Sequence, residues 1–412
     1  MANVSSSNGL EKRPKLRFPG FDEPWEHKEL LYYLVENTDR NKQLKFGKEN
    51  VLSVSGEYGI VNQIAFQGRS FAGESVADYH VVETDDIVYT KSPLKANPYG
   101  IIKVNNGVPG IVSTLYAVYH PLKTVVPRFV DFYFSNDLRL NKFLKPLVNI
   151  GAKHDMKVNN TFVLTGMVVF PPLREQQKIV DFLTILDRRI DVQRKKVEAL
   201  KKYKRGLLSR EFGQQENGDL NNRYVGKLKD YFHLSSGSTP SSTNRAFYSG
   251  NIRWVSSGEL KPKYLCETSQ HISFEAVSSC NLREYPANTL LVAMYGLEAA
   301  GVRGTASILS VPATISQACM AIQQTGEIDI EYLYYWYIYN GQWIGIRIAQ
   351  GTKQQNLSTD TLGNLRIHAP SCSKQKKVCK LLSQIDYLIE KEGQKIDLLS
   401  SAKRGLLQQL FI

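Results

Sequence analysis

The sequence predicts an α+β fold in which two mixed α/β domains are joined by two long antiparallel coiled-coil helices, with an internal pseudo-two-fold repeat. Three observations predict it. The chain has 412 residues, of which 42% are hydrophobic and 22% charged, enough for two or three domains with more than one core. When the sequence is shifted by 199 positions, residues 171–212 align with residues 370–411 without a gap. The segments before each copy are rich in β-branched and aromatic residues, with frequent Gly, Pro, Asn and Ser.

The two aligned copies predict one long helix each. They share Gln176 with Gln375, Asp187 with Asp386, and the string KRGLL that begins at Lys204 and Lys403. Apolar residues recur at alternating steps of four and three, which is the a/d pattern of a coiled coil over about four heptads. The predicted helix-pair core is Ile179, Leu183, Leu186, Ile190, Val197, Leu200 and Leu207 in the first copy, and Val378, Leu382, Ile385, Ile389, Ile396, Leu399 and Leu406 in the second.

Polar residues interrupt both heptad patterns at the same two places. Gln193 and Lys204 stand in the first pattern, and Glu392 and Lys403 stand in the second. A single amphipathic helix is often ordinary core packing, but matching interruptions in two copies favour two helices that pack on each other. Prolines at 171, 172 and 370 precede the helices, where proline is tolerated.

The domain boundaries follow from these helices. Late in each mixed domain we expect a further helix, over residues 126–144 and 328–349. The predicted segments are a flexible N-terminal tail (1–15), a first mixed domain (16–170), a central spacer helix (171–212), a linker (213–222), a second mixed domain (223–369) and a C-terminal spacer helix (370–412).

The charge of the chain favours a polyanionic partner. Lys and Arg outnumber Asp and Glu by 52 to 39, a balance that makes nucleic acid the first candidate. The two helix repeats carry 20 basic and 10 acidic residues, so they hold most of the net charge of +13. Such charge is often a solvated coiled-coil face; the alternative is a surface for phosphates or for an acidic protein. No apolar run reaches the roughly 18 residues of a membrane helix, and we expect a cytoplasmic protein.

Motifs for catalysis and for metal binding are weak. Asn97-Pro98-Tyr99-Gly100 approaches the N-P-P-[YFW] string of amino-methyltransferases, but the second proline is missing and a turn is favoured. Glu259-Leu260-Lys261 lacks the Pro-Asp that a metal-dependent nuclease would need. The seven histidines are scattered, and the five cysteines have no C-x-x-C spacing. We therefore expect no metal site and no catalysis in this chain.

The arrangement resembles the specificity (S) subunit of Type I restriction-modification systems. The resemblance rests on PPLREQQKI at Pro171, the two KRGLL strings, PKLRFPGF at Pro14 with Trp25, and SSGSTPSS at Ser235. It implies two target recognition domains, each reading one half of an asymmetric bipartite site in double-stranded DNA, and spacer helices that dock two methylation (M) subunits. Restriction (R) subunits would join through that complex. S-adenosylmethionine, ATP and magnesium would belong to the partners, and adenine methylation and restriction would be directed by a non-catalytic subunit. The second helix departs from the pattern, because PSCSKQKKV lacks the Pro-Pro and the Glu.

Candidate DNA contacts are polar loop residues of the types that meet base edges and phosphates. They are Lys91, Ser92, Lys95, Asn97, Lys153 and His154 in the first domain, and Ser238, Thr239, Arg245, Arg303, Lys353, Gln354 and Gln355 in the second. For each of them the alternative is a solvated loop side chain. A second hypothesis for the chain is a coiled-coil scaffold that joins two protein-binding domains without recognising DNA.

Overall fold

The structure is a computed structural model that describes residues 14–150, 156–213, 224–297, 301–349 and 356–411. The chain forms two compact units: unit 1 comprises Met1–Arg194 with Gln394–Ile412, and unit 2 comprises Lys195–Gly393. Each unit contains one mixed domain and half of each long helix. None of the helices in the described ranges combines the length and the apolar character needed to cross a bilayer.

The main sheet of unit 1 has four antiparallel strands in the order β2-β9-β6-β7. Tyr89 and Tyr119 belong to one buried apolar cluster, whereas Val88 and Val118 belong to another. Successive side chains of a strand point to opposite faces, so both faces of this sheet are covered. The strands are β2 (Leu34–Asn37), β6 (Ile87–Thr90), β7 (Ile102–Val104) and β9 (Tyr116–Pro121).

Two-stranded antiparallel ladders complete the β-structure of unit 1. The pairs are β1 (Glu26–Glu29) with β12 (Met167–Phe170), β3 (Leu52–Ser55) with β4 (Gly59–Asn62), β5 (His80–Val82) with β8 (Gly110–Val112), and β10 (Asn149–Ile150) with β11 (Met156–Lys157). The pair β1–β12 joins the start of the domain to its end, directly before the long helix. Short helices lie between the strands: η1 (Leu30–Tyr32), η2 (Lys48–Asn50), α1 (Gln63–Gln67), α2 (Pro127–Tyr133), α3 (Asp137–Leu144) and α4 (Asn160–Val163).

The single helix predicted over residues 126–144 is wrong in one respect, because the structure has two helices there. α2 ends before Phe134, and α3 starts after Asn136, whose side-chain oxygen accepts a hydrogen bond from the backbone N–H of Arg139. Asn favours this capping position over a helix interior. The cap therefore starts a new helix where hydrophobic periodicity alone suggested continuity.

Unit 2 contains a five-stranded sheet in the order β14-β22-β19-β20-β16 and a four-stranded sheet in the order β17-β15-β21-β18. β13 pairs with β23 as β1 pairs with β12 in unit 1. The strands are β13 (Tyr224–Lys227), β14 (Phe232–Ser236), β15 (Ile252–Val255), β16 (Tyr264–Leu265), β17 (Gln270–Ile272), β18 (Glu284–Tyr285), β19 (Leu290–Ala293), β20 (Ala306–Leu309), β21 (Ala313–Ile315), β22 (Cys319–Gln324) and β23 (Arg366–Ala369). The helices are α6 (Leu228–Tyr231), η3 (Arg245–Tyr248), η4 (Ser257–Glu259), α7 (Phe274–Ser279), α8 (Ile330–Trp343), the π-helix η5 (Ile344–Ile348) and α9 (Thr359–Gly363).

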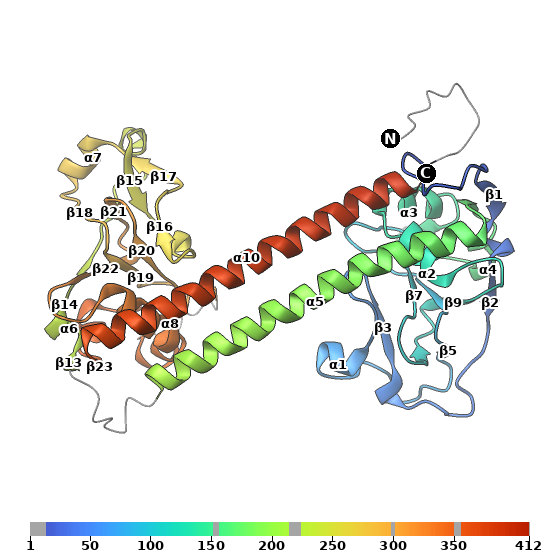
Figure 1. The fold of residues 1–412 in the computed structure, drawn as a ribbon, viewed down its shortest axis with the longest axis horizontal. Helices are drawn as coiled ribbons and strands as arrows, with labels where there is room; N and C mark the ends of the chain where they lie inside the picture. Colours follow the sequence, from blue (N-terminus) through green and yellow to red (C-terminus); the bar gives the residue numbers. More distant parts are fainter. Residues whose placement is uncertain (1–13, 151–155, 214–223, 298–300, 350–355, 412) are drawn as a thin grey trace. The chain divides into compact units, whose positions relative to one another are not determined.

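The two predicted long helices are confirmed as α5 (Leu173–Phe212) and α10 (Cys372–Leu410). They run antiparallel within each unit (Figure 1). In unit 1 the start of α5 lies beside the end of α10, where Lys403 pairs with Asp187. In unit 2 the end of α5 lies beside the start of α10, where Lys204 pairs with Asp386 at 2.5 Å. All fourteen residues named above as the predicted helix-pair core are buried or half-buried.

The start of each long helix is fastened to the neighbouring mixed domain by a buried glutamine. The side-chain oxygen of Gln176 accepts the backbone N–H of Val126, just before α2, at 2.9 Å, and its amide donates to the Pro171 carbonyl. Gln375 repeats this arrangement with the N–H of Asp329, just before α8, at 2.8 Å, and with the Pro370 carbonyl. The hydrogen bonds of each buried amide therefore tie the start of the long helix to the start of the neighbouring domain helix, α2 in unit 1 and α8 in unit 2.

The N-terminal segment explains why the first long helix carries a glutamate near its start. Arg17 donates two hydrogen bonds, of 2.8 and 2.7 Å, to the fully buried carboxylate of Glu175. The N–H of Leu16 donates to the carbonyl of Gln409, near the end of α10. The second copy has an exposed Lys374 in place of Glu175.

Candidate nucleic-acid interface

The predicted DNA-contacting loop of unit 1 is only partly available. Ser92 and Lys95 are exposed, whereas Lys91 is half-buried and donates to the side-chain oxygen of Asn160 at 3.2 Å. Asn97 is 6% exposed and donates to the carboxylate of Asp137 at 3.0 Å. Asn97 is therefore held within the fold by Asp137, and its assignment as a DNA contact stays a prediction. The loop position of Asn97 was visible in the sequence, but its partner 40 residues away was not.

The string Asn97-Pro98-Tyr99-Gly100 forms a turn, in which the N–H of Gly100 donates to the carbonyl of Asn97 at 3.0 Å. Gly100 has φ +89°, and a Cβ there would lie 1.9 Å from the carbonyl oxygen of Thr90. Only glycine fits this position without moving the strand. The geometry accounts for the string without any methyl-transfer site.

In unit 2 the predicted contacts also divide into exposed and structural residues. Thr239 and Arg245 are exposed, and the hydroxyl oxygen of Thr239 accepts the N–H of Gln317. Ser238 is exposed, and its N–H donates to the carbonyl of Ile315. Arg303 is half-buried and donates from Nε to the carbonyl of Leu297 at 2.9 Å, so it braces its own loop. The remaining candidates, Lys153, His154, Lys353, Gln354 and Gln355, lie outside the described residues.

Lys91 belongs to a polar cluster that sequence reasoning missed. Asn160, which accepts from Lys91, donates to the carboxylate of Glu36 at 2.8 Å. Burial, together with the positive charge of Arg40, lowers the pKa of Lys91, and Glu36 opposes this shift. Glu36 lies in β2, Arg40 after β2, Lys91 directly after β6 and Asn160 in α4, and no local sequence pattern connects them. The cluster can present positive charge beside a carboxylate and an amide.

Asp86 and His120 form a second polar contact in unit 1 that sequence analysis did not reveal. The carboxylate of Asp86, 1% exposed, accepts the N–H of Glu83 at 2.8 Å and contacts Nδ1 of His120. Burial raises the pKa of Asp86, although the hydrogen bonds from Glu83 and His120 oppose it. The side chain of His120 is 40% exposed. A buried carboxylate thus orients a ring that is open to solvent, and the 34 residues between the partners hid the pair from sequence analysis.

In each unit an aspartate of one long helix contacts both the other long helix and a helix of the mixed domain. In unit 1, Asp187 of α5 pairs with Lys403 of α10 and accepts from Arg128 of α2 at 3.4 Å. In unit 2, Asp386 of α10 pairs with Lys204 of α5 and accepts from the hydroxyl of Tyr335 on α8 at 2.8 Å. The lysines that interrupt the heptad patterns are therefore the cross-helix partners of these aspartates.

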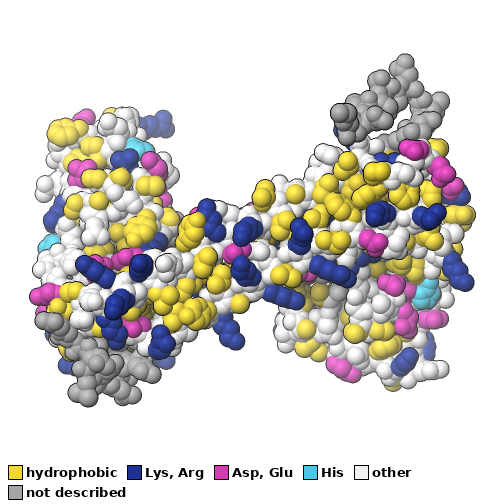
Figure 2. Space-filling model, in the orientation of Figure 1, with side chains coloured by type: hydrophobic (Ala, Val, Ile, Leu, Met, Phe, Trp, Pro, Cys, Tyr) yellow, Lys and Arg dark blue, Asp and Glu magenta, His cyan; other side chains and the backbone are white. Residues whose placement is uncertain are grey.

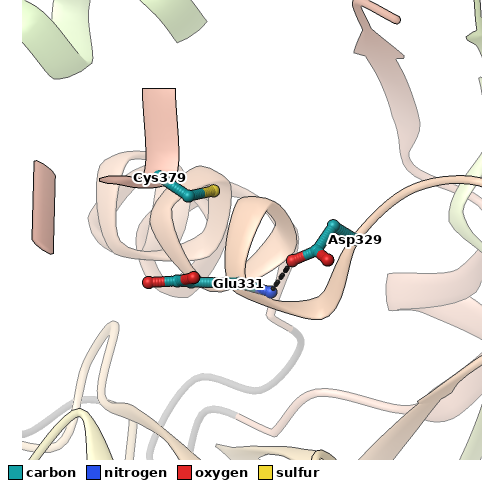
Figure 3. Close-up of side chains that lie close together, drawn as sticks. All are labelled: Asp329, Glu331 and Cys379. Atoms are coloured by element: carbon teal, nitrogen blue, oxygen red, sulfur yellow. Dashed lines mark hydrogen bonds between the residues drawn. The ribbon is translucent and has the colours of Figure 1, made fainter. Parts of the chain in front are cut away.

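One group of side chains in unit 2 has the composition of a metal site. Ligand atoms of Asp329, Glu331 and Cys379 lie within 4.8 Å of one another (Figure 3). However, Asp329 accepts the N–H of Glu331 as a helix cap, and Glu331 pairs with Lys263 and accepts from Ser383. Burial would raise the pKa of Glu331, but these hydrogen bonds outweigh it and lower the pKa; burial raises the pKa of the Cys379 thiol. The ammonium of Lys263 supplies the positive charge, and a protonated thiol is a poor ligand, so the group does not fit a resident metal.

The outer faces of the long helices carry basic and apolar side chains. Figure 2 shows Lys and Arg side chains along them. On α5, Arg188, Arg189, Arg194, Lys195, Lys201 and Lys202 are exposed, as are Tyr387, Leu388 and Lys391 on α10. These side chains lie outside the helix-pair core.

Comparisons with known proteins agree with this architecture. A specificity subunit of the type I restriction enzyme MjaIX from Methanocaldococcus jannaschii is 29% identical over 192 residues, which is 46% of this chain and 43% of that protein. The specificity subunit of EcoR124I/EcoR124II from Escherichia coli is 25% identical over 176 residues, 42% of each chain. Both matches thus span less than half of the relative's length.

Solved structures share the fold. The S subunit of a type I restriction-modification system from M. genitalium has a TM-score of 0.60 at 13% identity, covering 97% of this chain and 99% of that chain. A chain from a type I R-M system assembly has a TM-score of 0.55 at 16% identity, with the same coverage. The family model of the type I restriction modification DNA specificity domain matches residues 76–202 and 222–400. Since this is well over half of the chain, the chain belongs to the family of type I restriction-modification DNA specificity subunits.

Proposed function

We propose that this chain reads an asymmetric, bipartite site in double-stranded DNA, with one half-site for the mixed domain of each unit. The spacer helices α5 and α10 would hold the two readers at a set distance and dock two methylation subunits. Restriction subunits would join through that complex. The chain itself would contribute recognition, while S-adenosylmethionine, ATP and magnesium would serve the partners.

The observation that carries this proposal is the repeated attachment of unlike domains to like helices. The glutamines Gln176 and Gln375 and the aspartates Asp187 and Asp386 hold each mixed domain in the same way. The loops differ between the units: Ser92 and Lys95 are exposed in one, Thr239 and Arg245 in the other. A symmetric dimer binds two equal half-sites, because its two recognition domains are identical. Two unlike recognition domains attached to a repeated pair of helices would therefore bind two different half-sites.

A domain exchange tests the proposal. Residues 16–170 would be replaced by the corresponding segment of another specificity subunit, with Glu175, Gln176 and Asp187 kept, and the methylated sites of a host expressing the complex would be sequenced. We expect one half of the methylated motif to change while the other half and the gap stay as they are.

Exchange of residues 223–369 is the matched control and should change the other half alone. If both halves stay unaltered in both chimeras while methylation continues, the domains do not read DNA. If the purified chain with its methylation subunit shifts no duplex at all, the scaffold hypothesis is favoured instead.

A further inference from the structure

The loop that follows β2 in unit 1 has a counterpart after β14 in unit 2. β2 pairs antiparallel with β9, and β14 pairs antiparallel with β22. After β9 the chain enters α2, and after β22 it enters α8, the two helices to which the long helices are tied. The two loops, residues 38–45 and 237–245, therefore occupy equivalent places. No residue of the first loop is among the candidate DNA contacts predicted from the sequence.

Two buried asparagines hold the backbone of the first loop. The amide of Asn41 donates to the carbonyl of Phe46 at 2.8 Å, and its oxygen accepts the N–H of Phe46 at 3.1 Å. The amide of Asn37 donates to the carbonyl of Val81 at 3.0 Å, and its oxygen accepts the N–H of Asp39 at 2.8 Å. Buried polar groups that have their partners make the surrounding structure rigid. The backbone of this loop is therefore fixed by the fold.

The tip of the first loop is a turn with an uncommon backbone conformation. The N–H of Leu44 donates to the carbonyl of Asn41 at 2.9 Å, with Lys42 and Gln43 at the centre of the turn. Leu44 has φ +52°, which a leucine rarely adopts, and its side chain is 61% exposed. Such a conformation persists where the surroundings fix it, and it is common at binding sites. The turn thus presents the side chains of Lys42, Gln43 and Leu44 to solvent.

The side chains at this tip are of the types that read bases. In the major groove, lysine pairs with the guanine edge, glutamine pairs with the adenine edge, and an apolar side chain contacts the thymine methyl group. Gln43 has no side-chain hydrogen bond within the described ranges. Lys42 pairs with the exposed carboxylate of Asp78, a contact that water weakens. Both side chains are therefore available to a ligand.

The positive charge of the first mixed domain is concentrated at this loop. Residues 1–170 hold 20 basic and 17 acidic residues, and residues 38–45 hold three basic residues and one acidic residue. Burial, and then the positive charge of Arg40, lowers the pKa of Lys91, so the loop lies beside the polar cluster of Lys91. A contiguous apolar surface would favour a protein partner, but Leu44 is the one apolar residue of the loop. The charge and the polar side chains favour DNA.

The loop in unit 2 is held by other means and exposes other side chains. Trp254 donates from Nε1 to the carbonyl of Ser238 at 3.3 Å, and the hydroxyl of Tyr248 donates to the carbonyl of Pro240 at 2.8 Å. Its exposed residues include Thr239 and Arg245. Equivalent loops with unlike side chains would read unlike bases.

We propose that residues 38–45 form the loop that reads the half-site of unit 1, with Lys42, Gln43 and Leu44 meeting base edges in the major groove. Lys45, beside the tip, meets a phosphate. This inference rests on the proposed function and names the residues that would carry recognition in one domain. A fixed loop suits this role, because a backbone that is already ordered loses less freedom on binding.

The test substitutes Gln43→Ala and Lys42→Ala, one at a time, in the full chain with its methylation subunits, and sequences the methylated sites of the host. The exchange of residues 16–170 identifies which half of the motif belongs to unit 1. We expect each variant to accept further bases at one position of that half, with discrimination there reduced about 5- to 150-fold. The other half and the gap should stay unaltered. The melting temperature of the free chain should hold, because both side chains are exposed.

Lys45→Ala should act differently, because a phosphate contact carries no sequence information. Binding to all duplexes should weaken alike, and the slope of log K against log salt concentration should become shallower by about one unit. A shift assay over a range of salt concentrations measures this. A changed motif in this variant would overturn the phosphate role of Lys45.

Gln67→Ala is the matched control, since Gln67 is an exposed glutamine on α1 of the same unit, outside the loop. It should leave the motif unaltered. If Gln43→Ala and Lys42→Ala also leave the motif unaltered, or weaken binding to all sequences alike, the loop does not read bases and the inference is overturned. Loss of bound methylation subunits from the Gln43→Ala variant, counted by native mass spectrometry, would assign the loop to a protein contact and overturn it as well.

Failure of the inference and failure of the proposed function are distinguishable. If the exchange of residues 16–170 changes one half of the motif while the loop variants change nothing, unit 1 reads DNA through other residues and the proposed function stands. If the exchange changes neither half, the proposed function itself is contradicted.

Discussion

At the scale of single residues, His80 makes the stability of unit 1 depend on pH. The side chain is 2% exposed, and burial, with the positive charges of Arg40 and Lys91, lowers its pKa from 6.5 to about 4. Above pH 6.5 the ring is neutral in both the folded and the unfolded chain. Between pH 6.5 and 4 the unfolded chain binds a proton that the folded unit does not, so folding free energy is lost as the pH falls, by about 3 kcal/mol at pH 4.

We therefore expect the protection factors of unit 1 amides, which correct for the intrinsic slowing of exchange at lower pH, to fall between pH 6.5 and 4. His80→Gln should reduce this dependence, because glutamine does not titrate. His27→Gln, at an exposed position of the same unit, should leave it unchanged. Equal pH dependence in the wild type and in His80→Gln would show that another group dominates.

Single residues also mark the limit of what the sequence could predict. The polar interruptions Lys204 and Lys403 were visible in the heptad pattern, but their partners Asp386 and Asp187 were not. Gln176 and Gln375 were visible as repeated residues, but their contacts with Val126 and Asp329 were not. The reason is physical: an ion pair or a buried amide is defined by atoms that only the folded chain brings together. The hydrogen bond between Asn97 and Asp137 was hidden for the same reason.

At the scale of elements, the long helices were predictable because their signals are local. A heptad repeat, a preceding proline and a repeated KRGLL string need no knowledge of the rest of the fold. The strand order of the sheets was not predictable, since β14 pairs with β22 and β2 with β9 across most of a domain. From the sequence, the mixed domains could be assigned only to the mixed α/β class, without their strand order.

The ends of the long helices are anchored by repeated phenylalanines. Phe411 is 3% exposed, and its ring centre lies 5.4 Å from that of Phe129 in unit 1. Phe212 is 3% exposed and lies 5.2 Å from Tyr332 in unit 2. Phe411→Ala should destabilise unit 1, and Phe212→Ala unit 2, each by about 3–5 kcal/mol.

Hydrogen exchange with peptide resolution measures this, and each variant serves as the control for the other. The two rings belong to separate apolar clusters, so each loss should remain within its own unit. Equal loss of protection in both units from either variant would mean that the units unfold together.

At the scale of the whole molecule, the net positive charge lies on the repeated helices and not on the two unlike mixed domains, and this distribution fits the proposed function. The helix repeats hold most of the net positive charge, and their exposed Lys and Arg lie outside the helix-pair core. The mixed domains are close to balanced in charge, so their contribution to binding would come from specific contacts more than from a general field. Salt should therefore weaken binding to all DNA sequences alike while leaving the preference among them largely intact.

If α5 and α10 act as a spacer, their length should set the gap in the recognised site. Inserting one heptad into each helix, as copies of residues 191–197 and 390–396, keeps the apolar pattern in register and lengthens the pair by about 10.5 Å. This equals about three base pairs of DNA. We expect sequencing of methylated sites to show both half-sites unaltered and the gap longer by about three base pairs. The methylation rate should fall, since three base pairs also rotate one half-site by about 100° relative to the other. Seven residues inserted after Gly213, outside the helices, should leave the gap as it was; an unchanged gap in the heptad variant as well would refute the spacer.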